Sequence, residues 1–225
     1  MKSISAYIPF VVAMALVVVA SNVFVQFPVQ GTLGSLQLAD ILTWAAFTYP
    51  FAFLVTDLAN RKYGPAVARR IVFVGFMTAV VCSILVPPLL FKAGLIEFET
   101  AADRLVRIAV ASGAAFLTAQ LLDVTVFNWL RRQSWWRAPI FGTLAGSVFD
   151  TAIFFGIAFA SAFAFIGPDD AFALEPAPLL GVFSTETARW ISWAVGDFSV
   201  KLLIAVFALI PYRLIAAKWR QPALI

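Results

Sequence analysis

The stretch Gln120–Asp150, QLLDVTVFNWLRRQSWWRAPIFGTLAGSVFD, decides the fold class of this chain. Two apolar runs flank a short basic turn, and each run carries one acid, Asp123 in the first and Asp150 in the second. Helices that cross a bilayer need about 20 mostly apolar residues, and these runs reach that length when they are extended through their acids. A carboxylate at membrane depth is costly and by default faces the protein interior at a functional site. The stretch therefore predicts two membrane helices that each bury an acid.

The composition of the whole chain agrees with a membrane protein. Of its 225 residues, 62% are hydrophobic and only 12% are charged, whereas soluble domains are about 25% charged. We therefore expect one all-α polytopic membrane domain over residues 1–225, without a separate soluble domain. Six transmembrane helices are predicted, at about 6–27, 38–57, 68–91, 105–130, 138–166 and 187–215.

The placement of basic residues predicts how these helices are oriented. Most Lys and Arg residues fall at one set of helix ends: Lys2, Arg61, Lys62, Arg69, Arg70, Arg131, Arg132, Arg137, Arg213, Lys218 and Arg220. The opposite loops are mainly acidic, with Glu97, Glu99, Asp103, Asp169, Asp170, Glu175 and Glu186. Because short cytoplasmic loops are enriched in Lys and Arg, both termini are predicted to be cytoplasmic. This topology explains the net charge of +4 without a nucleic-acid partner.

The residue inventory gives no support for a metal centre or a redox cofactor. The chain has no histidine, the commonest metal ligand and proton shuttle. Its single cysteine, Cys82, lies in an apolar run and is expected to be a small buried side chain. We therefore expect no metal, no cofactor and no intrachain disulfide.

Polar side chains inside the predicted helices form a candidate substrate-binding set. Asn22 and Gln26 lie one helical turn apart on one face of the first helix, and Gln120 shares a face with Asp123. On the fifth helix, Thr143 and Ser147 are predicted to lie on the same side as its acid. The complete predicted set is Asn22, Gln26, Gln120, Asp123, Asp150, Asp197 and Lys201.

Two of these residues have the spacing of an ion pair. Asp197 and Lys201 are separated by four residues with the acid first, which is the favourable order on a helix. The pair either pins the orientation of the helix or belongs to a binding site, and Lys201 is also able to neutralise Asp123 or Asp150 on a neighbouring helix. Asp57 is expected at the cytoplasmic end of its helix, where it is hydrated.

The chemistry of this set suits a flat, polar ligand. A guanine-like ring presents two parallel N–H donors to a carboxylate and a carbonyl group to an amide donor. The 23 phenylalanines supply apolar walls for such a ring. Several nucleobases and vitamins fit this description, so the residues alone predict a ligand class rather than one ligand.

Several longer segments resemble a known family. They include Ser21-Asn22 with Gln26 and Pro28, TWAAFTYPFAFLVTDL (43–58), QLLDVTVFNWLR (120–131) and DFSVKLLIAVFALIPY (197–212). Together they are similar to the vitamin uptake transporter family of queuosine precursor transporters, over nearly the whole chain.

The resemblance implies a bacterial inner-membrane protein that imports 7-cyano-7-deazaguanine (preQ0), or the related preQ1, for synthesis of the modified tRNA base queuosine. It also implies a stand-alone transporter without an attached ATPase, and a homodimer is compatible with it. The polar positions carried over by resemblance are Asn22, Gln120, Asp123, Asp150, Asp197 and Lys201.

Two other functions are weighed against this one. The first is a substrate-capture subunit of an energy-coupled vitamin transporter. The second is an intramembrane aspartyl protease that uses Asp150 and Asp197. The protease motif Gly-x-Gly-Asp is replaced here by Ala194-Val195-Gly196-Asp197, and Pro222-Ala223-Leu224 lies in the tail with no helix after it.

Overall fold

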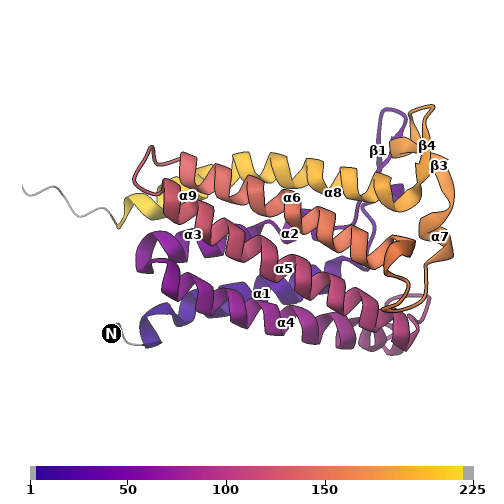
Figure 1. Cartoon of the computed structure of the whole chain (residues 1–225), viewed down its shortest axis with the longest axis horizontal. Helices are drawn as coiled ribbons and strands as arrows, with labels where there is room; N and C mark the ends of the chain where they lie inside the picture. The colour runs from indigo at the N-terminus through magenta and orange to yellow at the C-terminus, as the bar shows by residue number, and fades with distance from the viewer. Residues whose placement is uncertain (1–3, 220–225) are drawn as a thin grey trace, which may run out of the picture.

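The helices of the computed structural model, which describes residues 4–219, run along one long axis (Figure 1). Lys2, Arg220 and Pro222-Ala223-Leu224 were also considered in the sequence analysis, and these residues lie outside the described range. The longer helices are α1 (Ile8–Phe24), α3 (Phe51–Tyr63), α4 (Pro65–Lys92), α5 (Ala102–Leu130), α6 (Arg137–Phe159), α8 (Arg189–Phe207) and α9 (Leu209–Ala217).

Short elements fill the connections between these helices. They are the 3-10 turns Ile4–Tyr7, Leu38–Asp40, Ser161–Phe163 and Leu179–Gly181, the helical turns α2 (Ala45–Thr48) and α7 (Ala171–Leu174), and the strands β1 (Thr32–Leu33), β2 (Leu36–Gln37), β3 (Pro176–Pro178) and β4 (Glu186–Ala188). The strands form two antiparallel pairs, β1 with β2 and β3 with β4. The described part of the chain is therefore mostly helical, as the sequence predicts.

The distribution of side chains is that of a multi-pass membrane protein. Within residues 4–219, four helical stretches are long and apolar enough to cross a membrane: Pro65–Lys92, Ala102–Leu130, Arg137–Phe159 and Arg189–Ala217. Their outward faces carry large exposed apolar side chains such as Met77, Leu89 and Leu203, whereas Gln120 and Asp123 are completely buried. This arrangement suits lipid outside and polar contacts inside.

The predicted helix 38–57 is wrong in its first half. Residues 38–40 form a 3-10 turn, and residues 41–44 lie outside any helix. Val29 donates a backbone hydrogen bond to the Leu42 carbonyl, and Trp44 donates one to the Phe27 carbonyl. The helix starts only at α2 and is interrupted at Pro50, which has no N–H to donate. It then continues past residue 57 to Tyr63, where Gly64, with φ of 88°, ends it. Residues 39–43 form part of one wall of the site described below.

The predicted helix 138–166 ends early, at Phe159. The cause is Arg107, which is completely buried in α5. Its guanidinium donates hydrogen bonds to the backbone oxygens of Ile157 at 2.8 Å and Ala160 at 2.6 Å, and these carbonyls have no partner within a helix that stops here. The same group binds Asp169 at 2.9 Å, and this hydrogen bond holds the pKa of the Asp169 carboxyl below its usual range.

The remaining predicted helices agree with the structure apart from one break. The segments 6–27, 68–91 and 105–130 correspond to α1, α4 and α5 with small shifts at their ends. The segment 187–215 is divided into α8 and α9 at Ala208. Pro211 lies three residues beyond the break, and its ring clashes with the carbonyl of the residue four positions earlier, which explains the interruption.

The two ends of the bundle differ in charge. The start of α1 and the end of α9 lie at the same end, together with the α3–α4 and α5–α6 turns (Figure 1). This end carries the basic residues Arg61, Lys62, Arg69, Arg70, Arg131, Arg132, Arg137, Arg213 and Lys218. The two strand pairs and α7 lie at the opposite end (Figure 1). We call these the basic end and the hairpin end.

Candidate functional site

A cavity of about 760 Å³ lies among α1, α2, α4, α5, α6 and α8. Its lining includes Pro28, Phe98 and Phe172 from the connections at the hairpin end, so the cavity extends from that end into the bundle. Pockets for small molecules usually measure about 300–1,000 Å³. The space is therefore large enough for a bicyclic ring.

The deep part of the cavity holds one buried cation between two acids. Lys201 Nζ donates to Asp150 Oδ2 at 2.6 Å, to Thr151 Oγ1 at 3.2 Å and to Asp197 Oδ2. Tyr49 donates its hydroxyl hydrogen to Asp150 Oδ1 at 2.8 Å. We call Asp150, Lys201 and Asp197 the ionic triad. The i, i+4 pair predicted from the sequence is confirmed, and Asp150 on α6 joins it.

The hydrogen bonds of the triad leave one carboxylate oxygen available. All three N–H donors of Lys201 are used, and both oxygens of Asp150 accept hydrogen bonds. Asp197 receives Lys201 and Thr151 on Oδ2 alone, and its Oδ1 accepts no hydrogen bond from the described residues. The Asp197 side chain is 18% exposed, compared with 6% for Asp150. Within the triad, Asp197 is therefore the group best placed to accept hydrogen bonds from a ligand.

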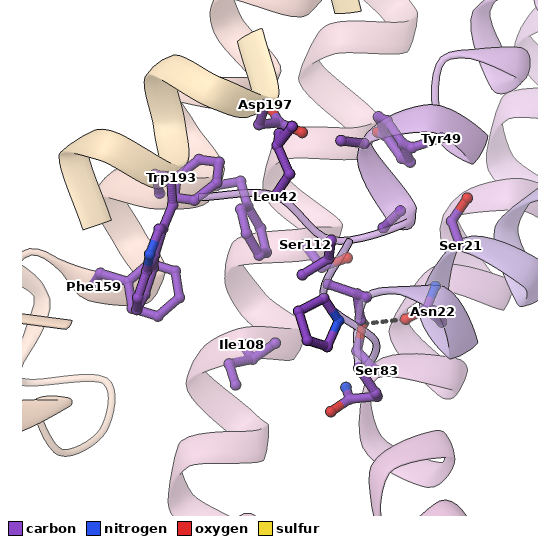
Figure 2. Close-up of a pocket in the computed structure, with 18 of the residues that line it drawn as sticks. Ser21, Asn22, Leu42, Tyr49, Ser83, Ile108, Ser112, Phe159, Trp193 and Asp197 are labelled. Atoms are coloured by element: carbon purple, nitrogen blue, oxygen red, sulfur yellow. Dashed lines mark hydrogen bonds between the residues drawn. The ribbon is translucent and has the colours of Figure 1, made fainter. Parts of the chain in front are cut away.

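Amide and hydroxyl groups of α1 and α4 line the facing wall. Asn22 donates to the Val18 carbonyl at 2.9 Å and accepts a hydrogen bond from Ser83 at 3.1 Å. Figure 2 shows this bond, with Ser21 and Asn22 across the cavity from Phe159 and Trp193. Gln26 also lines the cavity. Both predicted amides therefore border the cavity, but only Asn22 lies on α1, because the helix ends at Phe24 and Gln26 lies in the turn after it.

Aromatic side chains make the apolar wall toward the hairpin end. Phe159 and Trp193 meet edge to face with their ring centroids 5.3 Å apart, and Phe172 lies 6.2 Å from Trp193. Trp193 Nε1 donates to the Asp40 carbonyl at 2.9 Å, which fixes the indole ring. Aromatic faces held in this way are able to stack on a flat ligand.

Comparison with known proteins identifies the family of this chain. A family model described as "Putative vitamin uptake transporter" matches residues 43–215, more than half of the chain. The chain belongs to this family. The matched residues include α6 and α8, and therefore the whole ionic triad.

Curated relatives match over most of the chain. The "Queuosine precursor transporter" of Escherichia coli (strain K12) is 36% identical over 200 residues, covering 87% of this chain and 79% of that protein. A "Probable queuosine precursor transporter" of Haemophilus influenzae is 36% identical over 205 residues, with the same coverage. One from Bacillus subtilis is 29% identical over 181 residues, covering 76% of this chain and 69% of the relative. No solved structure gives a significant match.

Five of the seven predicted site residues line the cavity: Asn22, Gln26, Asp150, Asp197 and Lys201. Gln120 and Asp123 lie outside its lining. Gln120 is completely buried and accepts a hydrogen bond from Thr56 Oγ1 at 2.6 Å. Asp123 faces Asp57, within hydrogen-bonding reach. The sequence showed that Gln120 and Asp123 share a face but not which space that face borders.

The expectation that Asp57 is hydrated is wrong. Its side chain is buried, with only 2% of the residue exposed, because α3 continues for six residues beyond it and packs on α4 and α5. Asp57 and Asp123 contact no Lys or Arg side chain among residues 4–219. We call them the acid pair.

Several cavity residues were not singled out from the sequence. Tyr49 and Thr151 contact the ionic triad, and Ser83 contacts Asn22. Thr151 follows Asp150 directly, and Tyr49 precedes Pro50 inside an apolar run. These positions gave only weak evidence in the sequence that the two side chains belong to the site. Ser83 gave none, because a serine in a membrane helix commonly bonds to its own backbone.

The triad geometry does not suit an aspartyl protease. In such an enzyme two carboxyls share a proton, whereas here the Lys201 ammonium lies between Asp150 and Asp197 and binds both. Among residues 4–219, no group of three or more Cys, Asp and Glu side chains is arranged to hold a metal ion. The arrangement is instead a fixed cation between two acids at the deep end of a polar cavity.

Proposed function

We propose that this chain imports a queuosine precursor, most specifically 7-cyano-7-deazaguanine, across the bacterial inner membrane. The observation that carries the proposal is that relatives covering most of the chain are named queuosine precursor transporters. The cavity supports it, because its volume of about 760 Å³ and its polar groups suit a single bicyclic base.

In the proposed binding mode, Asp197 Oδ1 accepts hydrogen bonds from the guanine-like N–H and NH₂ edge of the ligand. The carbonyl group on the same ring accepts a hydrogen bond from the amide of Asn22 or Gln26, and the ring stacks near Phe159 and Trp193. Lys201 orients Asp197 and neutralises part of the negative charge rather than binding the base, since its three donors are already used.

The proposed topology has six membrane spans: α1, α2 with α3, α4, α5, α6, and α8 with α9. Both termini are cytoplasmic, because the basic end then faces the cytoplasm. The cavity reaches the hairpin end, so this conformation is outward-facing. Transport then proceeds by alternating access, and opening of the basic end releases the ligand inside.

Ligand binding is tested by thermal stabilisation of the purified protein with a panel of deazapurines, guanine and vitamins. A ligand that binds only the folded state raises the melting temperature. We expect 7-cyano-7-deazaguanine to give the largest increase. No increase with any 7-deazaguanine, alongside an increase with an unrelated vitamin, contradicts the proposed substrate.

Import is tested in cells that lack both precursor synthesis and their own precursor transporter. Expression of this chain is expected to restore queuosine in tRNA when the precursor is supplied. A host without an energy-coupling complex distinguishes the two transport models. Restoration only when such a complex is present identifies a substrate-capture subunit instead of a stand-alone importer.

A further inference from the structure

The acid pair lies between the cavity and the basic end of the bundle. Asp57 of α3 and Asp123 of α5 are 2% and 0% exposed, and their carboxyl groups are within hydrogen-bonding reach of each other. Both Asp123 oxygens and Asp57 Oδ1 are buried without a conventional donor among the described residues. Carboxyl oxygens in this situation need a proton between them.

The groups around the acid pair are neutral. Thr143 of α6 lies within hydrogen-bonding reach of Asp57. Asn60 of α3 donates to the Val124 carbonyl, and Gln120 of α5 bonds Thr56. Tyr212 of α9 borders the same small space as Asp57 and Thr143.

Two basic side chains at the basic end form hydrogen bonds to each other's backbone instead of to the acid pair. Arg61 donates to the Arg131 carbonyl at 2.8 Å, and Arg131 donates to the Arg61 carbonyl at 3.4 Å. No described cation therefore compensates the acid pair as Lys201 compensates Asp150 and Asp197. Two adjacent carboxylates in a dry interior cannot both be ionised, and they titrate as one unit.

Polar side chains of α6 lie between the cavity and the acid pair. On α6, Asp150 at the cavity is followed toward the basic end by Ser147 and then by Thr143, at spacings of three and four residues. These side chains share one face of the helix and span about 10 Å. Ser147 is 1% exposed, and its hydroxyl has no hydrogen-bond partner among the described residues. The donor and the acceptor of this hydroxyl are therefore available to a water molecule that carries a proton along this face.

A small cavity of about 10 Å³ lies beside Asp57. Thr143 and Tyr212 line it together with apolar residues of α3, α6, α8 and α9. A space of this size is close to the minimum for one water molecule. The acid pair therefore has a polar hydroxyl neighbour on α6 and, beside Asp57, a space close to the size of one water molecule.

We propose that Asp57 and Asp123 together form a proton-binding site, and that one proton moves inward with each substrate molecule. This inference rests on the proposed import function and adds the coupling ion to it. In the outward-facing state the proton enters through the cavity and passes Ser147 and Thr143 to the pair. When the basic end opens, the pair releases the proton to the cytoplasm.

One proton per neutral substrate has a quantitative consequence. A difference of one pH unit corresponds to about 1.4 kcal/mol per proton, which is about tenfold in a concentration ratio. In proteoliposomes, an inside-alkaline gradient of one unit is therefore expected to raise the accumulation of labelled 7-cyano-7-deazaguanine about tenfold. Asp123→Asn, which mimics the protonated acid in shape, is expected to lose this response.

A matched control lies on the same helix. Asp103→Asn removes an exposed carboxylate from the first turn of α5 and is expected to keep the wild-type response to the gradient. If wild-type protein takes up the base with an accumulation ratio that does not depend on the gradient, the proton proposal is overturned and the import proposal stands.

A second measurement does not depend on transport. Infrared difference spectroscopy detects the carbonyl stretch of a protonated carboxyl group. The purified wild-type protein and Asp103→Asn are expected to show this band at neutral pH, and the Asp57→Asn/Asp123→Asn double variant is expected to lose it. Thermal unfolding of the double variant verifies that it is folded. A wild-type spectrum identical to that of the folded double variant overturns the proton site, whether or not the base is transported.

Discussion

The ionic triad and the acid pair are two solutions to the same physical problem. Each buries two aspartates inside a membrane protein, where an uncompensated carboxylate is unfavourable. In the triad, Lys201 binds Asp150 and Asp197 and compensates one of the two charges. In the acid pair, Asp57 and Asp123 face each other and neutral groups, with no Lys or Arg contact among residues 4–219.

This difference determines whether each cluster is able to release a proton. A lysine held by three hydrogen bonds is a fixed counter-charge, so the triad presents a stable acceptor, Asp197 Oδ1, to a ligand. A pair of carboxyls without a cation depends on a proton, and a proton is free to leave when the surroundings change. The first cluster suits recognition of a base, and the second suits coupling.

The largest expected effect comes from removing the cation of the triad. Lys201→Met leaves Asp150 and Asp197 buried side by side without a counter-charge. Breaking a buried ion pair in this way costs about 3–5 kcal/mol. We expect a large decrease in melting temperature in detergent and loss of uptake.

The control for that variant is Lys218→Met, which removes an exposed lysine just beyond α9. Its melting temperature is expected to match the wild type. A Lys201→Met protein that is as stable as Lys218→Met contradicts the role of Lys201 as the compensating charge.

A smaller and more selective effect is expected at the ligand. Asp197→Asn removes the charged acceptor, while Lys201 keeps its bond to Asp150 and the fold is retained. Hydrogen bonds to charged groups contribute about 1.5–3 kcal/mol, which corresponds to about a ten- to hundredfold weaker affinity. Titration of 7-cyano-7-deazaguanine into the purified variant measures this change.

Asp150→Asn sharpens the same comparison. Both Asp150 oxygens are already bonded, to Tyr49 and Lys201, so this variant is expected to lose more stability and less affinity than Asp197→Asn. If Asp150→Asn loses more affinity and less stability than Asp197→Asn, the ligand contacts Asp150 instead.

The smallest effect is expected where α6 approaches the acid pair. A Cβ atom at Gly142 would lie 2.6 Å from Asp123 Oδ1, whereas one at Gly156 on the same helix would have nothing within 4 Å. Gly142→Ala is therefore expected to destabilise the protein by about 1–3 kcal/mol through overpacking. Gly156→Ala is expected to be neutral or slightly stabilising, because glycine is unfavourable inside a helix. Thermal unfolding of the two variants is compared directly, and equal melting temperatures contradict the close packing at Gly142.

The sequence predicted the polar residues better than it predicted their neighbours. The spacing of Asp197 and Lys201 is local information, so their ion pair followed from one helix. The choice of Asp150 rather than Asp123 as the third member depends on how α5, α6 and α8 pack, which no spacing within a helix determines. For the same reason, Gln120 and Asp123 were expected in the cavity and lie outside it.

The errors in helix boundaries also have long-range causes. The first half of 38–57 is apolar enough for a helix, but its backbone bonds to residues 27–29. The end of 138–166 is set by Arg107, a residue 52 positions before Phe159 on another helix. Asp57 was expected to be hydrated because its helix was predicted to end at that residue.

The division of roles between the two clusters is tested most directly by equilibrium binding of 7-cyano-7-deazaguanine to purified Asp197→Asn and Asp123→Asn proteins. The account predicts that Asp197→Asn weakens binding by about tenfold or more, whereas Asp123→Asn binds the base with an affinity close to that of the wild type. Lost binding in Asp123→Asn together with unchanged binding in Asp197→Asn would contradict the assignment of the ligand to the ionic triad.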